Sequence, residues 1–281
     1  MATQSSIYSG NTLPLRPRIK HAVKVLIESL PLAGDLFHRY YLYPRTTTAC
    51  QGVYASQRDA QAAIDQHVSS EYDTCNEIRS VEDDIQQEHQ HEYEDYPVLF
   101  WLKGLLRPGI HIVDLGGSTG GTFYAFDRAL DFPDDLAWTV AELPAAVEKG
   151  RLVAEARRAH RLGFVTGLNQ AENPDLLLTM GTLQYMPETL SEMVGALPAY
   201  PEHIIVNKIP TTDAPSFWTV QNLGAAQVPY FVYNRNELIE SMLAIGYLML
   251  DSCNSLRAIR IPFHAEHDVI HYSGFFFQRA G

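Results

Sequence analysis

A glycine-rich stretch at residues 113–121 (VDLGGSTGG) carries the strongest chemical signal in the sequence. Glycines at a strand-to-helix turn let the backbone approach a ligand closely, and the start of the following helix offers unpaired N–H groups. We expect such a turn to hold a nucleotide-like ligand, with a purely structural turn as the alternative. The residues expected to form the binding turn are Asp114, Gly116, Gly117, Ser118, Thr119 and Gly120.

A second acid, Glu142, ends an apolar run at residues 137–142, about 25 residues after the glycines. An acid in this position can accept hydrogen bonds from the hydroxyl groups of a ribose. Leu143 and Pro144 would then lie beside the adenine. The glycines and Glu142 together indicate an adenosine-containing cofactor, a class that includes the nicotinamide dinucleotides. A solvated acid that caps the next helix is the alternative for Glu142.

A third segment, residues 175–187 (DLLLTMGTLQYMP), is typical of a buried strand and its exit loop. Ligands of open α/β sheets bind outside the carboxyl ends of the strands, so this loop should face the ligand. Lys208 lies at the exit of the next expected strand and is a candidate for holding an anionic substrate. The other candidates are Met180 and Gly181 for the cofactor, and Gln184 and Tyr185 for orienting the acceptor.

Histidines near the end of the sequence are the remaining chemical candidates. His264, His267 and His271 are spaced three and four residues apart, which would suit a metal site on a helix. Pro262 and the strand expected after these histidines leave little room for a regular helix, and no cysteine lies close by. We therefore predict no metal site, and we keep His264 as a candidate base.

The elements that must position these residues alternate between strands and helices from residue 101 onward. Such alternation predicts right-handed crossovers and a mostly parallel sheet with helices on both faces. Strands are expected at residues 110–115, 137–142, 162–166, 175–179 and 203–209, and helices at 119–130, 143–160 and 188–197.

The two ends of the sequence depart from this alternation. A short helix at 236–245 is closed by Gly246, and strands at 247–250 and 272–278 follow without a helix between them. These two strands suggest an antiparallel pair at the edge of the sheet. The first hundred residues are expected to be mainly helical, with helices at 19–30 and 57–68.

Residues 213–233 form an expected insertion between the fifth strand and the next helix. Its aromatic residues are Phe217, Trp218, Tyr230, Phe231 and Tyr233. A long aromatic loop in this place can close over a substrate, or its rings can pack the N-terminal helices onto the sheet. Tyr96, just before the first expected strand of the sheet, has the same two interpretations: contact with the cofactor or packing.

A parallel sheet with an antiparallel closing pair, together with the Asp114 turn, resembles the Rossmann-like fold of class I S-adenosylmethionine-dependent methyltransferases. Residues 51–54 (QGVY), 95–102 (DYPVLFWL), 183–185 (LQY) and 221–230 (QNLGAAQVPY) further resemble a little-characterised family of bacterial methyltransferases, whose members are often found with polysaccharide or other secondary biosynthesis genes. The resemblance covers residues 50–281. It implies S-adenosyl-L-methionine as the cofactor and O- or N-methylation of a small metabolite, carboxylate or sugar-like acceptor.

Composition sets limits on the partners. The 281 residues carry 21 basic and 33 acidic side chains, a net charge of −12 that disfavours nucleic acid as a partner. No apolar run reaches the roughly 20 residues of a membrane span, and three scattered cysteines fit a reducing cytoplasm. Residues 13–45 are basic and residues 46–100 acidic, so we expect these two stretches to neutralise one another.

Two units are therefore expected. Residues 1–100 form an N-terminal helical region that acts as a lid or in oligomerisation, with a homodimer as one arrangement, and residues 101–281 form the methyltransferase domain. A nicotinamide-dependent oxidoreductase, which would use the same glycine turn, is the first alternative function. A non-catalytic binding protein that retains the methyltransferase fold is the second.

Overall fold

The computed structural model describes residues 30–70, 80–86 and 90–281. The helix expected at residues 19–30 therefore lies, except for its last residue, outside the described part of the chain. Every helix within that part is too short or too polar to span a bilayer.

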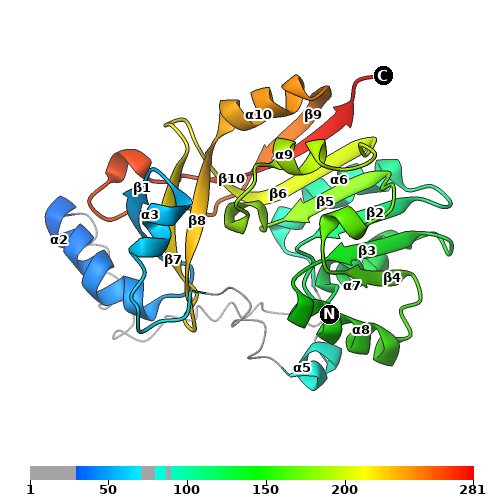
Figure 1. Cartoon of the computed structure of the whole chain (residues 1–281), viewed down its shortest axis with the longest axis horizontal. Helices are drawn as coiled ribbons and strands as arrows, with labels where there is room; N and C mark the ends of the chain where they lie inside the picture. Colours follow the sequence, from blue (N-terminus) through cyan, green and yellow to red (C-terminus); the bar gives the residue numbers. More distant parts are fainter. Residues whose placement is uncertain (1–29, 71–79, 87–89) are drawn as a thin grey trace, which may run out of the picture.

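A parallel sheet forms the centre of the molecule (Figure 1). Its strands stand in the order β4-β3-β2-β5-β6, and each is parallel to its neighbours. Their bounds are β2 His111–Leu115, β3 Ala137–Ala141, β4 Leu162–Val165, β5 Leu176–Met180 and β6 His203–Thr212. Each lies within a residue or two of its expected position, except that β6 runs three residues longer.

Two further strands close the sheet beyond β6. β10 (Tyr272–Arg279) pairs antiparallel with β6, and β9 (Tyr247–Asn254) pairs antiparallel with β10 and forms the edge. The antiparallel closing pair predicted from the sequence is thereby confirmed. The whole sheet has the Rossmann-like arrangement of class I methyltransferases.

Helices cover both faces of this sheet because its central strands are apolar on both sides. In β2 and β5, alternate residues point to opposite faces. Ile112 and Leu178 pack with one cluster, and Val113 and Leu177 with the other. The first cluster contains residues of α6 (Tyr96–Leu105), α7 (Gly121–Leu130) and α8 (Pro144–Arg157), and the second contains residues of α9 (Leu190–Gly195) and α10 (Arg235–Ala244).

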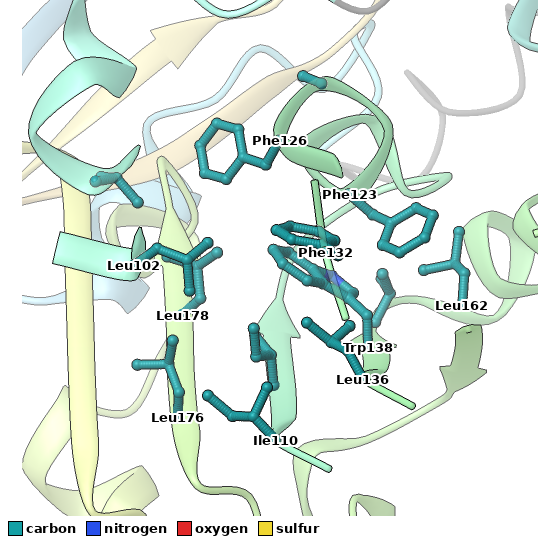
Figure 2. Packing of buried hydrophobic residues seen from close by; sticks show 14 of the residues in the cluster. Leu102, Ile110, Phe123, Phe126, Phe132, Leu136, Trp138, Leu162, Leu176 and Leu178 are labelled. Atoms are coloured by element: carbon teal, nitrogen blue, oxygen red, sulfur yellow. The ribbon is translucent and has the colours of Figure 1, made fainter. Parts of the chain in front are cut away.

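Aromatic rings fill much of the first cluster (Figure 2). Trp138 of β3 is fully buried, and its ring stacks on that of Phe132 with centroids 5.5 Å apart. Phe123 of α7 meets the Trp138 ring edge to face at 5.8 Å. This packing fixes the position of α7, the helix that follows the glycine turn.

A small antiparallel sheet joins the central sheet at the carboxyl end of β6. β1 (Cys50–Tyr54) pairs with β7 (Phe217–Asn222), β7 pairs with β8 (Gln227–Asn234), and the end of β8 runs parallel to the end of β6. The insertion at residues 213–233 is thus a β-hairpin and not the loop that the sequence suggested. The N-terminal region likewise contributes a strand in addition to its helices.

The remaining helices of the described residues are short. α3 begins after the N-cap Ser56, whose hydroxyl accepts a hydrogen bond from the Asp59 N–H at 3.1 Å, and it ends at Ala62, six residues earlier than expected. The buried Ala60 packs in one cluster with Trp218 and Val220 of β7. The bounds are α2 Pro31–Phe37, η1 His38–Leu42, η2 Tyr43–Arg45, α3 Gln57–Ala62, α5 Val81–Gln86, η3 Tyr93–Asp95, η4 Leu168–Gln170, η5 Leu183–Tyr185 and η6 Ala265–His267.

Candidate functional site

The glycine turn follows β2 and leads into α7. Gly116 and Gly120 have φ angles of +77° and +91°, which favour glycine over residues with a side chain. A Cβ atom at Gly116 would collide with the side chain of Thr182, and one at Gly120 would lie 2.6 Å from Leu162. Gly116 donates its N–H to the Ala141 carbonyl of β3 at 2.9 Å. The turn is therefore packed tightly against the ends of the neighbouring strands.

The side chain of Asp114 packs against this turn. Its side chain is buried, Trp138 Nε1 donates a hydrogen bond to Oδ2 at 3.3 Å, and a Cβ atom at Gly117 would collide with its carboxylate. Burial raises the pKa of Asp114 to about 7, because the charged form loses its solvation. The Trp138 hydrogen bond opposes this rise, and the charge of Glu142 adds to it. Asp114 is therefore placed to position the turn.

A cavity of about 360 Å³ opens beside the turn, at the carboxyl ends of β2, β3, β4 and β5. Gly116 forms one wall, and Glu142 and Leu143 at the end of β3 form the next. Residues 166–169 and part of α9 complete the lining, together with Thr182. Among the six residues predicted to form the binding turn, Gly116 alone lines this cavity, and it does so together with Glu142.

Glu142 and Leu143, predicted to contact a ribose and an adenine, both line this cavity. Glu142 is half-buried, and its Oε2 accepts a hydrogen bond from the Leu143 N–H at 2.6 Å. Leu143 is 41% exposed although it is apolar, so it offers a free surface for a planar ring. Met186 adds a second apolar contact from the far side of the cavity.

Sequence reasoning missed several lining residues. Residues 166–169 follow β4. They stand at the carboxyl edge of the sheet, so the rule that pointed to residues 180–185, and with them to Thr182, would also have found residues 166–169. The contribution of α9, through Glu192 and Met193, carries no comparable signal in the sequence.

The exit of β5 holds Met180, Gly181, Gln184 and Tyr185 in a tight turn. Gly181 has a φ angle of +74°, and its N–H donates to the Asn207 carbonyl at 2.9 Å. Gln184 is buried, and its Nε2 donates to the Gly181 carbonyl at 2.7 Å. The Tyr185 hydroxyl donates to Gln221 Oε1 of β7 at 2.7 Å. None of these four residues is among those that line the cavity.

Lys208 lies at the bend of β6, where its φ angle is +57°. Its Nζ is 2.8 Å from Asp95 and 3.1 Å from Glu92. Arg257 forms ion pairs with Glu92 at 2.7 Å and with Glu94 at 2.6 Å. The ammonium group that the sequence assigned to a substrate anion is thus paired with carboxylates of the chain itself.

These contacts fasten the segment before α6 to the middle of β6. Asn207 Nδ2 adds a hydrogen bond to the Glu94 carbonyl at 2.8 Å. The charges of Lys208 and Arg257 hold the pKa of Glu92 below its ordinary value, against the opposing effect of burial. Tyr96 follows directly as the first residue of α6 and is 58% exposed.

His264 lies in a different part of the molecule. It precedes the η6 turn, in the connection between β9 and β10, and its neighbour His267 meets the ring of Phe217 edge to face at 4.8 Å. Figure 1 shows this orange-red turn beside β1, well separated from the β2–α7 turn. The structure therefore does not bring the candidate base His264 to the cavity. It does bring His264 close to His267 and Glu266.

Several solved structures are similar to this chain. One is the 1,6-didemethyltoxoflavin-N1-methyltransferase of Burkholderia thailandensis, with bound S-adenosylhomocysteine, at 18% identity and a TM-score of 0.46 over 68% of this chain and 80% of that one. Magnesium protoporphyrin IX methyltransferase of Synechocystis, also with S-adenosylhomocysteine, has 12% identity and a TM-score of 0.46 over 71% and 93%. The cyclase SpnF has 14% identity and a TM-score of 0.46 over 83% and 99%. The sequence matches no family model and no curated protein.

Proposed function

We propose that the protein transfers a methyl group from S-adenosyl-L-methionine to a small-molecule acceptor. The observation that carries the proposal is the single cavity shared by the Gly116 turn, Glu142 and Leu143. Gly116 leaves room for the backbone to contact the cofactor, Glu142 offers acceptor oxygens to two ribose hydroxyls, and Leu143 covers one face of the adenine. The turn residues Gly117, Ser118, Thr119 and Gly120 would enclose the amino-acid end, above the supporting Asp114.

The bound cofactor supplies an electrophilic methyl group on a positively charged sulfur. The chain must align the acceptor with that methyl group and keep water away from it. The exit of β5 is suited to this task because Gln184 and Tyr185 are held rigidly, by the Gly181 carbonyl and by Gln221. An acceptor carboxylate would need no base, whereas a hydroxyl or amine would have to lose a proton.

We further propose that the β7–β8 hairpin and the N-terminal region form the acceptor side of the site. β1 pairs with β7, and Tyr185 ties the exit of β5 to Gln221 of β7. Residues 92–95 approach the same edge of the sheet through Lys208. The N-terminal region would then act as a lid or as a contact between subunits of a dimer.

Isothermal titration of the purified protein with S-adenosylhomocysteine and, separately, with NAD tests the cofactor. We expect S-adenosylhomocysteine to bind and NAD not to bind; tight binding of NAD alone would identify an oxidoreductase instead.

The variant Gly116→Ala tests the turn. It should abolish binding of S-adenosylhomocysteine because its Cβ atom meets Thr182. Gly104→Ala is the matched control, since a Cβ atom there has no neighbour within 4 Å.

A second variant separates loss of the ribose contact from damage to the fold. Glu142→Gln keeps the size of the side chain but weakens its ability to accept two hydrogen bonds, so we expect weaker binding of S-adenosylhomocysteine with an unchanged melting temperature of the free protein. Incubation with labelled S-adenosylmethionine and a panel of small carboxylates, phenols and sugars then tests transfer. Cofactor binding without labelling of any acceptor would favour a non-catalytic protein.

A further inference from the structure

A cluster of metal-binding side chains lies outside the proposed methyltransferase site. His264, Glu266 and His267 each offer one ligand atom, and these three atoms lie within 4.8 Å of one another. The Glu266 Oε1 atom is 3.6 Å from His264 Nδ1 and 3.1 Å from His267 Nδ1. We infer that these three residues form a binding site for a divalent zinc-like cation.

Two of the three distances between the ligand atoms are close to those that such an ion requires. Zinc binds nitrogen and oxygen ligands at about 2.0–2.2 Å, so neighbouring ligands of a tetrahedral site lie roughly 3.3–3.6 Å apart. The two distances to Glu266 are close to this value. Two imidazoles and one carboxylate favour zinc over magnesium or calcium, which prefer oxygen ligands alone.

The backbone around the cluster is already organised to hold it. Ile259 and Val269 pair through two hydrogen bonds of 2.8 and 2.9 Å, which close the loop that contains the three ligands. Asp268 Oδ1 accepts a further bond from the Ile261 N–H at 2.7 Å. Phe263 has a φ angle of +68°, a conformation that a residue with a side chain adopts only where its surroundings require it. Binding would therefore need little rearrangement of the chain.

The site is open to solvent but is anchored on one side. The side chains of His264 and Glu266 are 42% and 66% exposed, so an ion and a coordinated water molecule can reach them. His267 is fixed against Phe217 of the β7–β8 hairpin. Arg260 in the same loop pairs with Asp35 of α2 at 2.9 Å. A bound ion would thus stiffen the loop where it contacts both the hairpin and the N-terminal region.

Calorimetric titration of untagged, chelator-treated protein with ZnCl₂ tests the site, with elemental analysis after dialysis. We expect one zinc ion to bind per chain and no binding of Mg²⁺ under the same conditions. Titration with Co²⁺ should give the visible absorption of a four-coordinate ion. The absence of zinc binding by the intact chain would overturn the inference.

Three variants locate the bound ion. Glu266→Gln and His264→Gln alter exposed side chains, so the fold should tolerate both. Each should weaken zinc binding more than about tenfold, since even the loss of a residue that only supports a ligand costs 10–100-fold. His271→Gln changes the third histidine of the same segment, which is not part of the cluster, and should bind zinc like the unmodified chain. Equal zinc affinity in all three variants would show that the ion binds elsewhere.

Discussion

Replacement of Asp114 by Asn should stabilise the protein at alkaline pH but not at acidic pH. The pKa of Asp114 is raised from 3.8 to about 7 in the folded protein, chiefly by burial. The folded chain therefore retains the Asp114 proton between about pH 4 and pH 7, whereas the unfolded chain releases it. The folded state binds more protons over this range, so the free energy of unfolding falls as the pH rises.

The size of the effect follows from the displacement of the pKa. Each pH unit between the two pKa values corresponds to 1.36 kcal/mol, so the buried carboxylate costs up to about 4 kcal/mol above pH 7. Asn cannot ionise, and its side-chain oxygen can still accept the Trp138 hydrogen bond. We expect the variant to gain up to about 4 kcal/mol over the original protein at pH 8 and to show almost no difference at pH 4.

Urea denaturation at pH 4, 6 and 8 measures this difference. Asp175→Asn is the matched control, because hydrogen bonds from the His111 N–H and from Arg107 hold the pKa of Asp175 below its ordinary value, against the effect of burial. That variant should be less stable than the original protein at pH 6 and 8, and the difference should shrink as the pH falls through the lowered pKa. An Asp114→Asn protein that is no more stable than the original at pH 8 would refute the reasoning about burial.

Three other substitutions test how the chain supports the site, each by its free energy of unfolding in urea. Lys208→Ala leaves the buried Asp95 without its cation and should cost about 3–5 kcal/mol. Tyr185→Phe leaves Gln221 Oε1 buried without a donor and should cost about 1–3 kcal/mol. Ala60→Leu overfills the contact between α3 and β7 and should cost about 1–3 kcal/mol; no loss would contradict the docking of α3.

The central sheet was predictable because each of its strands is a short apolar run next to a turn. Residues 176–178 are fully buried on both faces, so the run of three leucines predicts their environment correctly. β7 was missed because it is not a continuous apolar run. Thr219, Gln221 and Asn222 are polar and yet buried, because their partners come from distant segments: Asn222 Nδ2 donates to the Tyr43 carbonyl at 2.6 Å. A sequence alone does not show such partners.

The same distinction applies to the site. Gly116 and Glu142 lie at fixed places relative to their own strands, and both line one cavity. Lys208 was assigned to a substrate anion because its partners, Glu92 and Asp95, lie far away in the sequence. His264 was assigned as a base from residue type alone, and the fold carries it to the β9–β10 connection. The surroundings of a side chain were predictable only where the neighbouring residues of its own element determine them.

The ion-pair partners of the acidic stretch likewise come from distant parts of the sequence. The acidic stretch at residues 46–100 was expected to neutralise the basic stretch before it. Three of its described acids pair with cations of residues 101–281: Glu94 with Arg257, Asp95 with Lys208, and Asp84 with Lys149 at 3.7 Å.

The carboxylates of these three pairs are nearly inaccessible to solvent, so added salt screens them weakly. Separation of residues 92–95 from the sheet would have to hydrate several charges, among them Glu94 and Asp95, at the same time. Any opening on this side should therefore respond only weakly to ionic strength. An acceptor is then expected to enter between the β7–β8 hairpin and the exit of β5, where neutral hydrogen bonds such as that of Tyr185 with Gln221 make the contact.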